Sequence, residues 1–434
     1  MTDESKKIKL NEVFGIQSEI PRYTYVDRSG LDERFQYFWG SQRHIVIHGA
    51  SKQGKTCLRK KNLSPSDTIV IHCQPSMNVN SILSEILRNL GVSLPEQKTV
   101  KTASSNAEEV TGNVTGKIPI FIESKVEGKS FDSHSAESVS TSKYADGYYE
   151  DIPFISQKIK ESGKRLIFED FHYFDEDVRK DVAYLLKPFF ELGIFVLIIG
   201  IWAEQNLLYY YNGDLTGRIE EINIAWSPGE LNEVLEKGER ALNIKFSDEI
   251  KQEMIAASFE NVGLLQRLAE KICKIENIYE QQDRMKIISN IESLRSAERE
   301  IVNEISQRYL KIKDVFERGF RSNTELKVYY QIFHLLTEID ERQLINGIHQ
   351  AEILRNIQTY SEKTIRPGDL TAALTRIEKL QIEREINPLL VSYNHILRTL
   401  VLGDREFLFF RKFSKIKWEW LTDSDISIGD QSIQ

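Results

Sequence analysis

The chain has 434 residues, 41% of them hydrophobic, and a formal net charge of −8. At about 150 residues per domain this length predicts two or three domains, and the hydrophobic content excludes a disordered chain. The acidic balance excludes a basic field over the whole surface, although it leaves room for a local basic face.

The cysteines and the apolar runs indicate in which cellular compartment the protein is expected. Cys57, Cys73 and Cys273 are odd in number and widely spaced, which argues against a disulfide framework or a zinc site and favours reduced thiols. The amino-terminal segment has no apolar signal core. The longest apolar run, Ile194 to Ile201, falls far short of the ~20 residues of a membrane span. We therefore expect a soluble, cytoplasmic protein without membrane contact.

The first ninety residues read as an arm followed by the start of an α/β domain. Residues 1–20 are predicted to be a flexible arm, and residues 29–39 a helix. A short β-branched strand follows at 44–48 and a second at 68–71, before an amphipathic helix at 78–90.

The next segment interrupts this pattern, which resumes after it. Residues 97–145 are rich in Ser, Thr, Val, Gly and Glu, and are predicted to be an insertion that contains a β-hairpin. Apolar strands are expected at 166–170, 194–199 and 219–224, with a helix at 175–192 between the first two. Strands that alternate with helices predict an α/β fold with a parallel sheet flanked by helices.

The domain boundaries follow from these changes in pattern. The α/β core is expected over residues 21–227. The pattern is then almost entirely helical, with a small helical lid over 228–292 and a third unit over 293–420. The polar tail, 421–434, is predicted to be disordered.

One short motif carries most of the chemical information. Its eight residues match the P-loop pattern G-x-x-x-x-G-K-[ST] and are Gly49, Ala50, Ser51, Lys52, Gln53, Gly54, Lys55 and Thr56. The glycines let backbone N–H groups surround phosphate oxygens, Lys55 pairs with the β and γ phosphates, and the Thr56 hydroxyl ligates Mg²⁺. The alternative is a glycine turn beside a solvated lysine. Cys57, directly after the motif, is also assigned to nucleotide binding.

An acidic pair, Glu169 and Asp170, follows an apolar strand. Because ligands bind beyond the carboxyl ends of parallel strands, we assign Glu169 to the metal shell and Asp170 to activating water, roles that are open to exchange. The alternative is an acid that favours the next helix through its dipole. His172 is interpreted as a structural imidazole, with a γ-phosphate contact as the alternative.

Four further residues are candidates for the hydrolytic machinery. Glu204 and Asn206 follow the next apolar strand, where a polar side chain can reach the γ-phosphate; the alternative is ordinary loop polarity. Arg218 precedes the last strand and is a candidate arginine finger for a neighbouring subunit; a local salt bridge and a contact in the same subunit are the alternatives. Arg267 is a candidate to fold back over the nucleotide from the lid, against a solvated helix face.

Together these motifs resemble the AAA+ and STAND ATPases, near the origin-recognition-type branch, over about residues 20–280. The resemblance implies ATP and Mg²⁺ as ligands, a homo-oligomer, and adenine binding by a segment that here includes Asp27 and Arg28. The sequence departs from the family pattern in three places. The acids read Glu-Asp rather than Asp-Glu, Trp202 stands near the expected polar residue of the sensor strand, and Gln266 stands where the lid arginine is expected.

The last unit has a winged-helix pattern. A helix over 371–385 carries a partly basic face, and β-like runs follow at 389–393 and 405–410. Such a unit can place a helix in a DNA groove, so we expect possible DNA contact through residues 370–417, with phosphate contacts from Arg411, Lys412, Lys415 and Lys417. Glutamates on the same helix favour the alternative, docking of a protein.

Three hypotheses follow. The leading one is a regulatory ATPase whose nucleotide state controls self-assembly and engagement of an unidentified protein partner or effector, of a kind that acts in mobile-element biology or phage defence. The second is an ATP-gated DNA-binding protein of the origin-recognition type. The third is a scaffold that binds ATP without hydrolysing it.

Overall fold

The computed structural model describes residues 7–17, 19–92, 151–202, 206–318, 327–361, 363–395 and 397–415. The predicted insertion at 97–145, Glu204, Lys417 and the tail at 421–434 lie outside these ranges. Within the described ranges, no helix combines the length and the apolarity needed to cross a membrane.

The core of the molecule is a parallel sheet of five strands in the described part of the chain, in the order β2-β3-β4-β1-β5. The strands are β1 (His44–His48), β2 (Thr68–His72), β3 (Arg165–Glu169), β4 (Val196–Ile199) and β5 (Ile219–Asn223). Every residue of the central strands β1 and β4 is buried, as expected for short β-branched runs covered on both faces. The predicted α/β class with a parallel sheet is confirmed.

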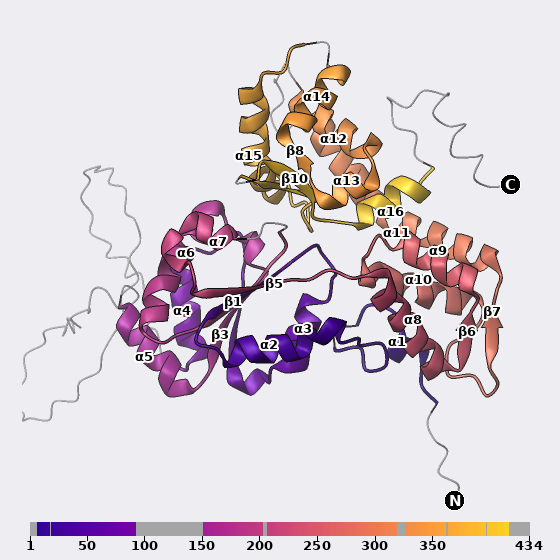
Figure 1. The fold of residues 1–434 in the computed structure, drawn as a ribbon, viewed down its shortest axis with the longest axis horizontal. Coiled ribbons are helices and arrows are strands. Elements are labelled where there is room, and N and C mark those ends of the chain that lie inside the picture. Colours follow the sequence, from indigo (N-terminus) through magenta and orange to yellow (C-terminus); the bar gives the residue numbers. More distant parts are fainter. Residues whose placement is uncertain are drawn as a thin grey trace, which may run out of the picture.

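Helices cover both faces of this sheet (Figure 1). On one face lie α2 (Leu31–Gly40) and α3 (Lys55–Asn62), whose Phe35, Phe38 and Leu58 pack on β1 and β4. On the other face lie α4 (Val79–Asn89), α5 (Ile152–Ser162), α6 (Glu176–Glu191) and α7 (Leu207–Tyr211).

A helical unit follows the sheet along the chain. It consists of α8 (Pro228–Leu242), β6 (Ile244–Phe246), α9 (Asp248–Ala257), α10 (Val262–Ile275) and β7 (Lys286–Ile288). The prediction of a flexible arm is wrong for residues 10–14. Leu10–Val13 form α1, and Phe14 is fully buried against Gly238 of α8, where any added Cβ would lie 2.1 Å from its ring. The lack of a side chain at Gly238 makes room for this contact.

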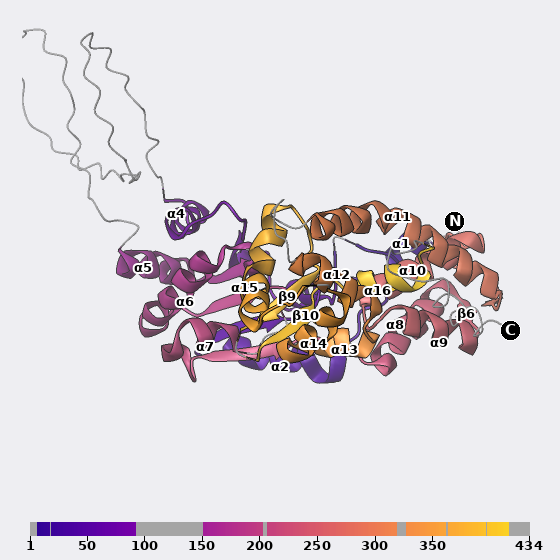
Figure 2. The same cartoon turned by 90° about the horizontal axis from the view of Figure 1, so that it is seen from above.

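The C-terminal unit lies over both the sheet and the helical unit (Figures 1 and 2). Its elements are α11 (Ile291–Glu317), α12 (Val328–Glu338), α13 (Glu341–Asn346), β8 (Ile348–His349), α14 (Gln350–Tyr360), α15 (Pro367–Glu383), β9 (Val391–Asn394), β10 (Thr399–Leu402) and α16 (Glu406–Phe413). The antiparallel sheet β8-β10-β9 is consistent with the expected winged helix. The β-like assignment of 405–410 is wrong, because residues 406–410 lie in α16 and its phenylalanines pack on the core.

Candidate nucleotide site

The loop between β1 and α3 has the shape that a P-loop requires. Gly49 has a φ of 141°, and a Cβ there would lie 2.6 Å from the carbonyl oxygen of Ile224. Gly54 has a φ of 82° and caps the amino end of α3. Both positions therefore need glycine, one for a close backbone approach and both for a left-handed conformation. The loop and the amino end of α3 line one cavity, and a helix terminus of this kind favours an anion.

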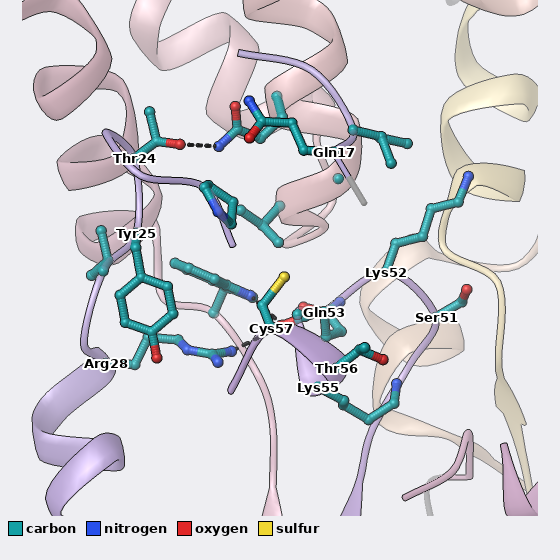
Figure 3. Close-up of a pocket in the computed structure, with 18 of the residues that line it drawn as sticks. Gln17, Thr24, Tyr25, Arg28, Ser51, Lys52, Gln53, Lys55, Thr56 and Cys57 are labelled. Atoms are coloured by element: carbon teal, nitrogen blue, oxygen red, sulfur yellow. Dashed lines mark hydrogen bonds between the residues drawn. The ribbon is translucent and has the colours of Figure 1, made fainter. Parts of the chain in front are cut away.

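This cavity measures about 300 Å³. The P-loop residues Ser51 to Thr56 and Cys57 form one wall, and the segment before α2, including Thr24, Tyr25 and Arg28, forms the opposite wall (Figure 3). Gln266 of α10 and Trp226, which precedes α8, close the remaining sides. Its lining combines a phosphate-binding loop with an apolar and aromatic wall, which suits a nucleotide.

Lys55 has no carboxylate partner among the described residues. Its Nζ donates to the carbonyl oxygens of Gly49 at 3.1 Å and Ala50 at 2.6 Å. Burial lowers the pKa of Lys55 to about 7, and the negative charge of Asp170 offsets only part of this shift. A bound anion would stabilise the charged form.

The acidic pair lies at the carboxyl end of β3, beside the P-loop. Thr56 Oγ1 donates to Glu169 Oε1 at 2.6 Å, and Arg59 holds the other oxygen at 2.9 Å. Asp170 lines the cavity with a φ of 61°, and burial, followed by the charge of Glu169, raises its pKa. Among the described residues no group of three or more His, Cys, Asp or Glu is arranged to hold a metal. Thr56 and Asp170 line the cavity, whereas Glu169 does not and is bonded to Thr56. This set fits Mg²⁺, which takes few protein ligands and completes its shell with phosphate and water.

His172 and Asn206 are held away from the cavity. His172 Nδ1 accepts a hydrogen bond from the Ile201 N–H at 3.2 Å, and burial lowers the pKa of His172 to about 3, so it is neutral near pH 7. Asn206 precedes α7, and its N–H donates to the Glu221 carboxylate at 3.0 Å. Neither residue lines the cavity.

Arg218 lies at the other end of the sheet. Its carbonyl accepts from His44 at the amino end of β1, whereas the P-loop follows the carboxyl end. The guanidinium donates to the Asp214 carbonyl and lies over the Phe190 ring, 5.3 Å from its centroid. A contact between Arg218 and the nucleotide of its own subunit is thus ruled out by position.

The contact predicted from the lid is displaced by one residue. Arg267 points away from the cavity and pairs with Glu406 at 2.7 Å and Glu304 at 2.6 Å. Its neighbour Gln266 lines the cavity instead and donates to Thr24 Oγ1 at 2.8 Å. Of the two residues predicted in the segment before the P-loop, Arg28 lines the cavity, whereas Asp27 does not and accepts from the N–H of Asp32 at 2.9 Å.

Sequence reasoning missed a direct contact between the P-loop and the C-terminal unit. The Ser51 N–H donates to the Gly403 carbonyl at 3.0 Å, and Lys52 pairs with Glu406 at 2.8 Å. The Glu406 side chain is 0% exposed and also faces Arg267 and Arg308. Burial alone would raise the pKa of Glu406, but these three cations outweigh it and lower the pKa. Partners so distant in the chain leave no local signal.

A second contact holds the C-terminal unit on the sheet. Arg179 of α6 pairs with Glu378 of α15 at 3.1 Å, and both side chains are largely buried. The rings of Tyr210 and His395 stack nearby, with centroids 6.3 Å apart. Part of the helix that was expected to enter a DNA groove therefore faces α6 in this arrangement.

No protein-family model matches the chain, and no curated protein matches it by sequence. Among solved structures, a Walker-type ATPase of Pyrococcus abyssi is 13% identical with a TM-score of 0.48, covering 93% of this chain and 100% of that one. Cdc6 of Pyrobaculum aerophilum is 13% identical with a TM-score of 0.41, covering 94% and 98%. A STAND protein of Pyrococcus horikoshii with a tetratricopeptide repeat sensor is 13% identical with a TM-score of 0.36, covering 93% of this chain and 44% of that one. At these TM-scores the similarities carry no argument about the site, whose interpretation rests on its own geometry.

Proposed function

We propose that this chain is a regulatory ATPase in which the bound nucleotide controls self-assembly and the engagement of a protein partner. One observation carries the proposal: the P-loop is bonded to the C-terminal unit through Ser51 and Gly403 and through Lys52 and Glu406. A ligand that moves the P-loop therefore changes contacts that hold the C-terminal unit. A two-state switch requires such a differential contact.

The ligand is proposed to be ATP with Mg²⁺. The P-loop N–H groups and Lys55 bind the phosphates, Thr56 and Glu169 hold the metal, and Asp170 orients the attacking water. Bound Mg²⁺ would neutralise charge on the phosphate oxygens. The hydrogen bond of 2.6 Å between Thr56 and Glu169 supports this assignment, because it already brings the two oxygen ligands together.

Assembly is proposed to depend on Arg218. Because Arg218 lies at the opposite end of the sheet from its own cavity, its proposed target is the γ-phosphate held by a neighbouring copy. Hydrolysis would then remove the group that Arg218 recognises and release the neighbour. The effector is proposed to be another protein that recognises the assembled form.

The test is the molar mass by light scattering with ADP, with ATP, and with ATP on the variants Lys55→Ala and Arg218→Ala. ATP should increase the mass of the wild type but of neither variant. The matched control is Arg43→Ala, which removes an exposed arginine from the same end of the sheet and should assemble as the wild type does. A mass that never changes with nucleotide would overturn the assembly proposal and would direct attention to salt-dependent DNA binding by residues 300–420.

A further inference from the structure

Arg28 is a buried cation that the preceding mechanism does not use. It lies in the turn before α2, is only 7% exposed, and lines the cavity (Figure 3). Its Nη1 donates to the Gln53 carbonyl at 3.0 Å, and its guanidinium lies 4.4 Å from the centroid of the Trp226 ring. The indole N–H of Trp226 donates to the same carbonyl at 3.0 Å. These contacts fix the plane of the guanidinium.

The charge of Arg28 is only partly compensated by the described residues, because Glu230 and Asp32 act on it without forming an ion pair. None of the described carboxylates forms an ion pair with the guanidinium within 4.0 Å. The bond to Gln53 is its one hydrogen bond to the described residues, and the buried Nε has no partner. Burial lowers the pKa of Arg28, a sign that its charge is poorly solvated. A buried charge without a partner is strongly unfavourable, so such a group usually meets its counter-ion in a ligand.

The position of Arg28 identifies the part of the ligand that it would meet. A Cβ built on Gly54, the cap of α3, would lie 4.0 Å from Arg28 Nη2. Arg28 and Lys55 therefore flank the same helix terminus. Like Arg28, Lys55 donates its hydrogen bonds to backbone carbonyl oxygens. Two cations and the amino end of a helix converge on one space, and that combination favours an anion.

We propose that Arg28 binds the phosphate chain of the nucleotide, opposite Lys55, rather than the adenine. This inference rests on the proposal that the cavity takes a nucleotide, and it assigns Arg28 a partner within that ligand. A planar guanidinium with a free edge suits two phosphate oxygens, whereas adenine carries no charge to compensate it. The role of Trp226 is to hold the guanidinium in place by stacking.

The experiment is isothermal titration with tripolyphosphate, ADP and adenosine on the wild type, Arg28→Gln and Arg28→Lys. Arg28→Gln should weaken tripolyphosphate and ADP by about 10- to 100-fold and leave adenosine within about 2-fold. Arg28→Lys keeps the charge but loses the planar fork of donors. Its affinity for tripolyphosphate and ADP should therefore lie between those of the wild type and Arg28→Gln. The matched control is Arg34→Gln, an exposed arginine on α2 outside the cavity, which should bind all three ligands as the wild type does.

Three results distinguish the explanations. Unchanged binding of tripolyphosphate and ADP by Arg28→Gln would overturn the role of Arg28. An equal loss for adenosine would also overturn it, because Arg28 would then support the wall of the cavity. Failure of the wild type to bind any of the three ligands would instead overturn the nucleotide proposal itself. If Arg28→Gln does not fold, the comparison of Arg28→Lys with the wild type decides.

Discussion

Two groups of buried charged residues each include one lysine of the P-loop, and they differ in how their charges are compensated. The cavity cations, Lys55 and Arg28, are held by backbone carbonyl oxygens and form no ion pair within 4.0 Å with any described carboxylate. The junction cluster places the Glu406 carboxylate among Lys52, Arg267 and Arg308. Lys52 and Lys55 are three residues apart in the chain and belong to different groups.

The difference separates residues that hold the protein together from residues that await a ligand. A buried ion pair is damaged when one partner is removed, because the other charge is then left alone. A buried charge without a partner already carries that penalty, so its removal from the ligand-free protein costs little. Changes in the junction cluster should therefore affect stability, and changes in the cavity cations should affect nucleotide binding.

The largest expected effect is that of Glu406→Gln. It leaves three cations without their shared carboxylate, and should lower the free energy of unfolding by about 3 kcal/mol. Urea denaturation measures the loss. The control is Glu300→Gln, which removes an exposed carboxylate from its pair with Lys271 and should change the free energy by less than about 0.5 kcal/mol. Equal losses in the two variants would remove the distinction between buried and exposed pairs.

An effect of similar size is expected for Lys55→Met, but on nucleotide affinity rather than on stability. Nucleotide affinity should fall by about 100-fold, the amount expected for losing a hydrogen-bonded charge on the phosphates. The free energy of unfolding without nucleotide should not fall, because the charge that is removed is buried and only partly offset by Asp170. Lys52→Met, in the same loop, should instead lower stability and change affinity less. If titration calorimetry and urea denaturation rank the two variants the same way, the comparison fails.

The smallest effect is a proton taken up on binding. The pKa of Lys55 is lowered from 10.5 to about 7, so between these values the unfolded chain binds more protons than the folded one. The contribution of Lys55 to stability without nucleotide should therefore rise with pH over this range. Phosphate oxygens would raise the pKa of Lys55 again. Nucleotide binding at about pH 8.5 should therefore be accompanied by the uptake of about one proton. Calorimetry in buffers of different ionisation enthalpy measures this uptake, and Lys55→Met should abolish it.

The features that could be predicted from the sequence are encoded by contiguous residues. The P-loop conformation depends on a run of eight residues, and the strands of the sheet are short β-branched runs bounded by turns. In contrast, all four residues from Phe407 to Phe410 are buried, so the run shows no periodicity and a helix cannot be told from a strand. The β-like assignment of 405–410 failed for this reason.

The contacts between units could not be predicted in the same way. Successive residues of a helix point about 100° apart, so an error of one position exchanges Gln266, which lines the cavity, with Arg267, which does not. Glu406 meets its partners at positions 52, 267 and 308, which only the tertiary fold brings together. Such contacts depend on the placement of whole units, which no local pattern encodes.

The amino-terminal segment spans two bodies. Its beginning is anchored in the helical unit, where Phe14 packs beside Gly238 and Phe246. Its end is anchored in the core, where Arg28 donates to Gln53. Gly15, Gln17 and Thr24, in between, form part of the cavity wall. The segment thus connects the helical unit to the core. A rotation of the helical unit would therefore move the side of the cavity that this segment forms. A chain shortened to begin at residue 21 would lose the anchor and part of that wall together.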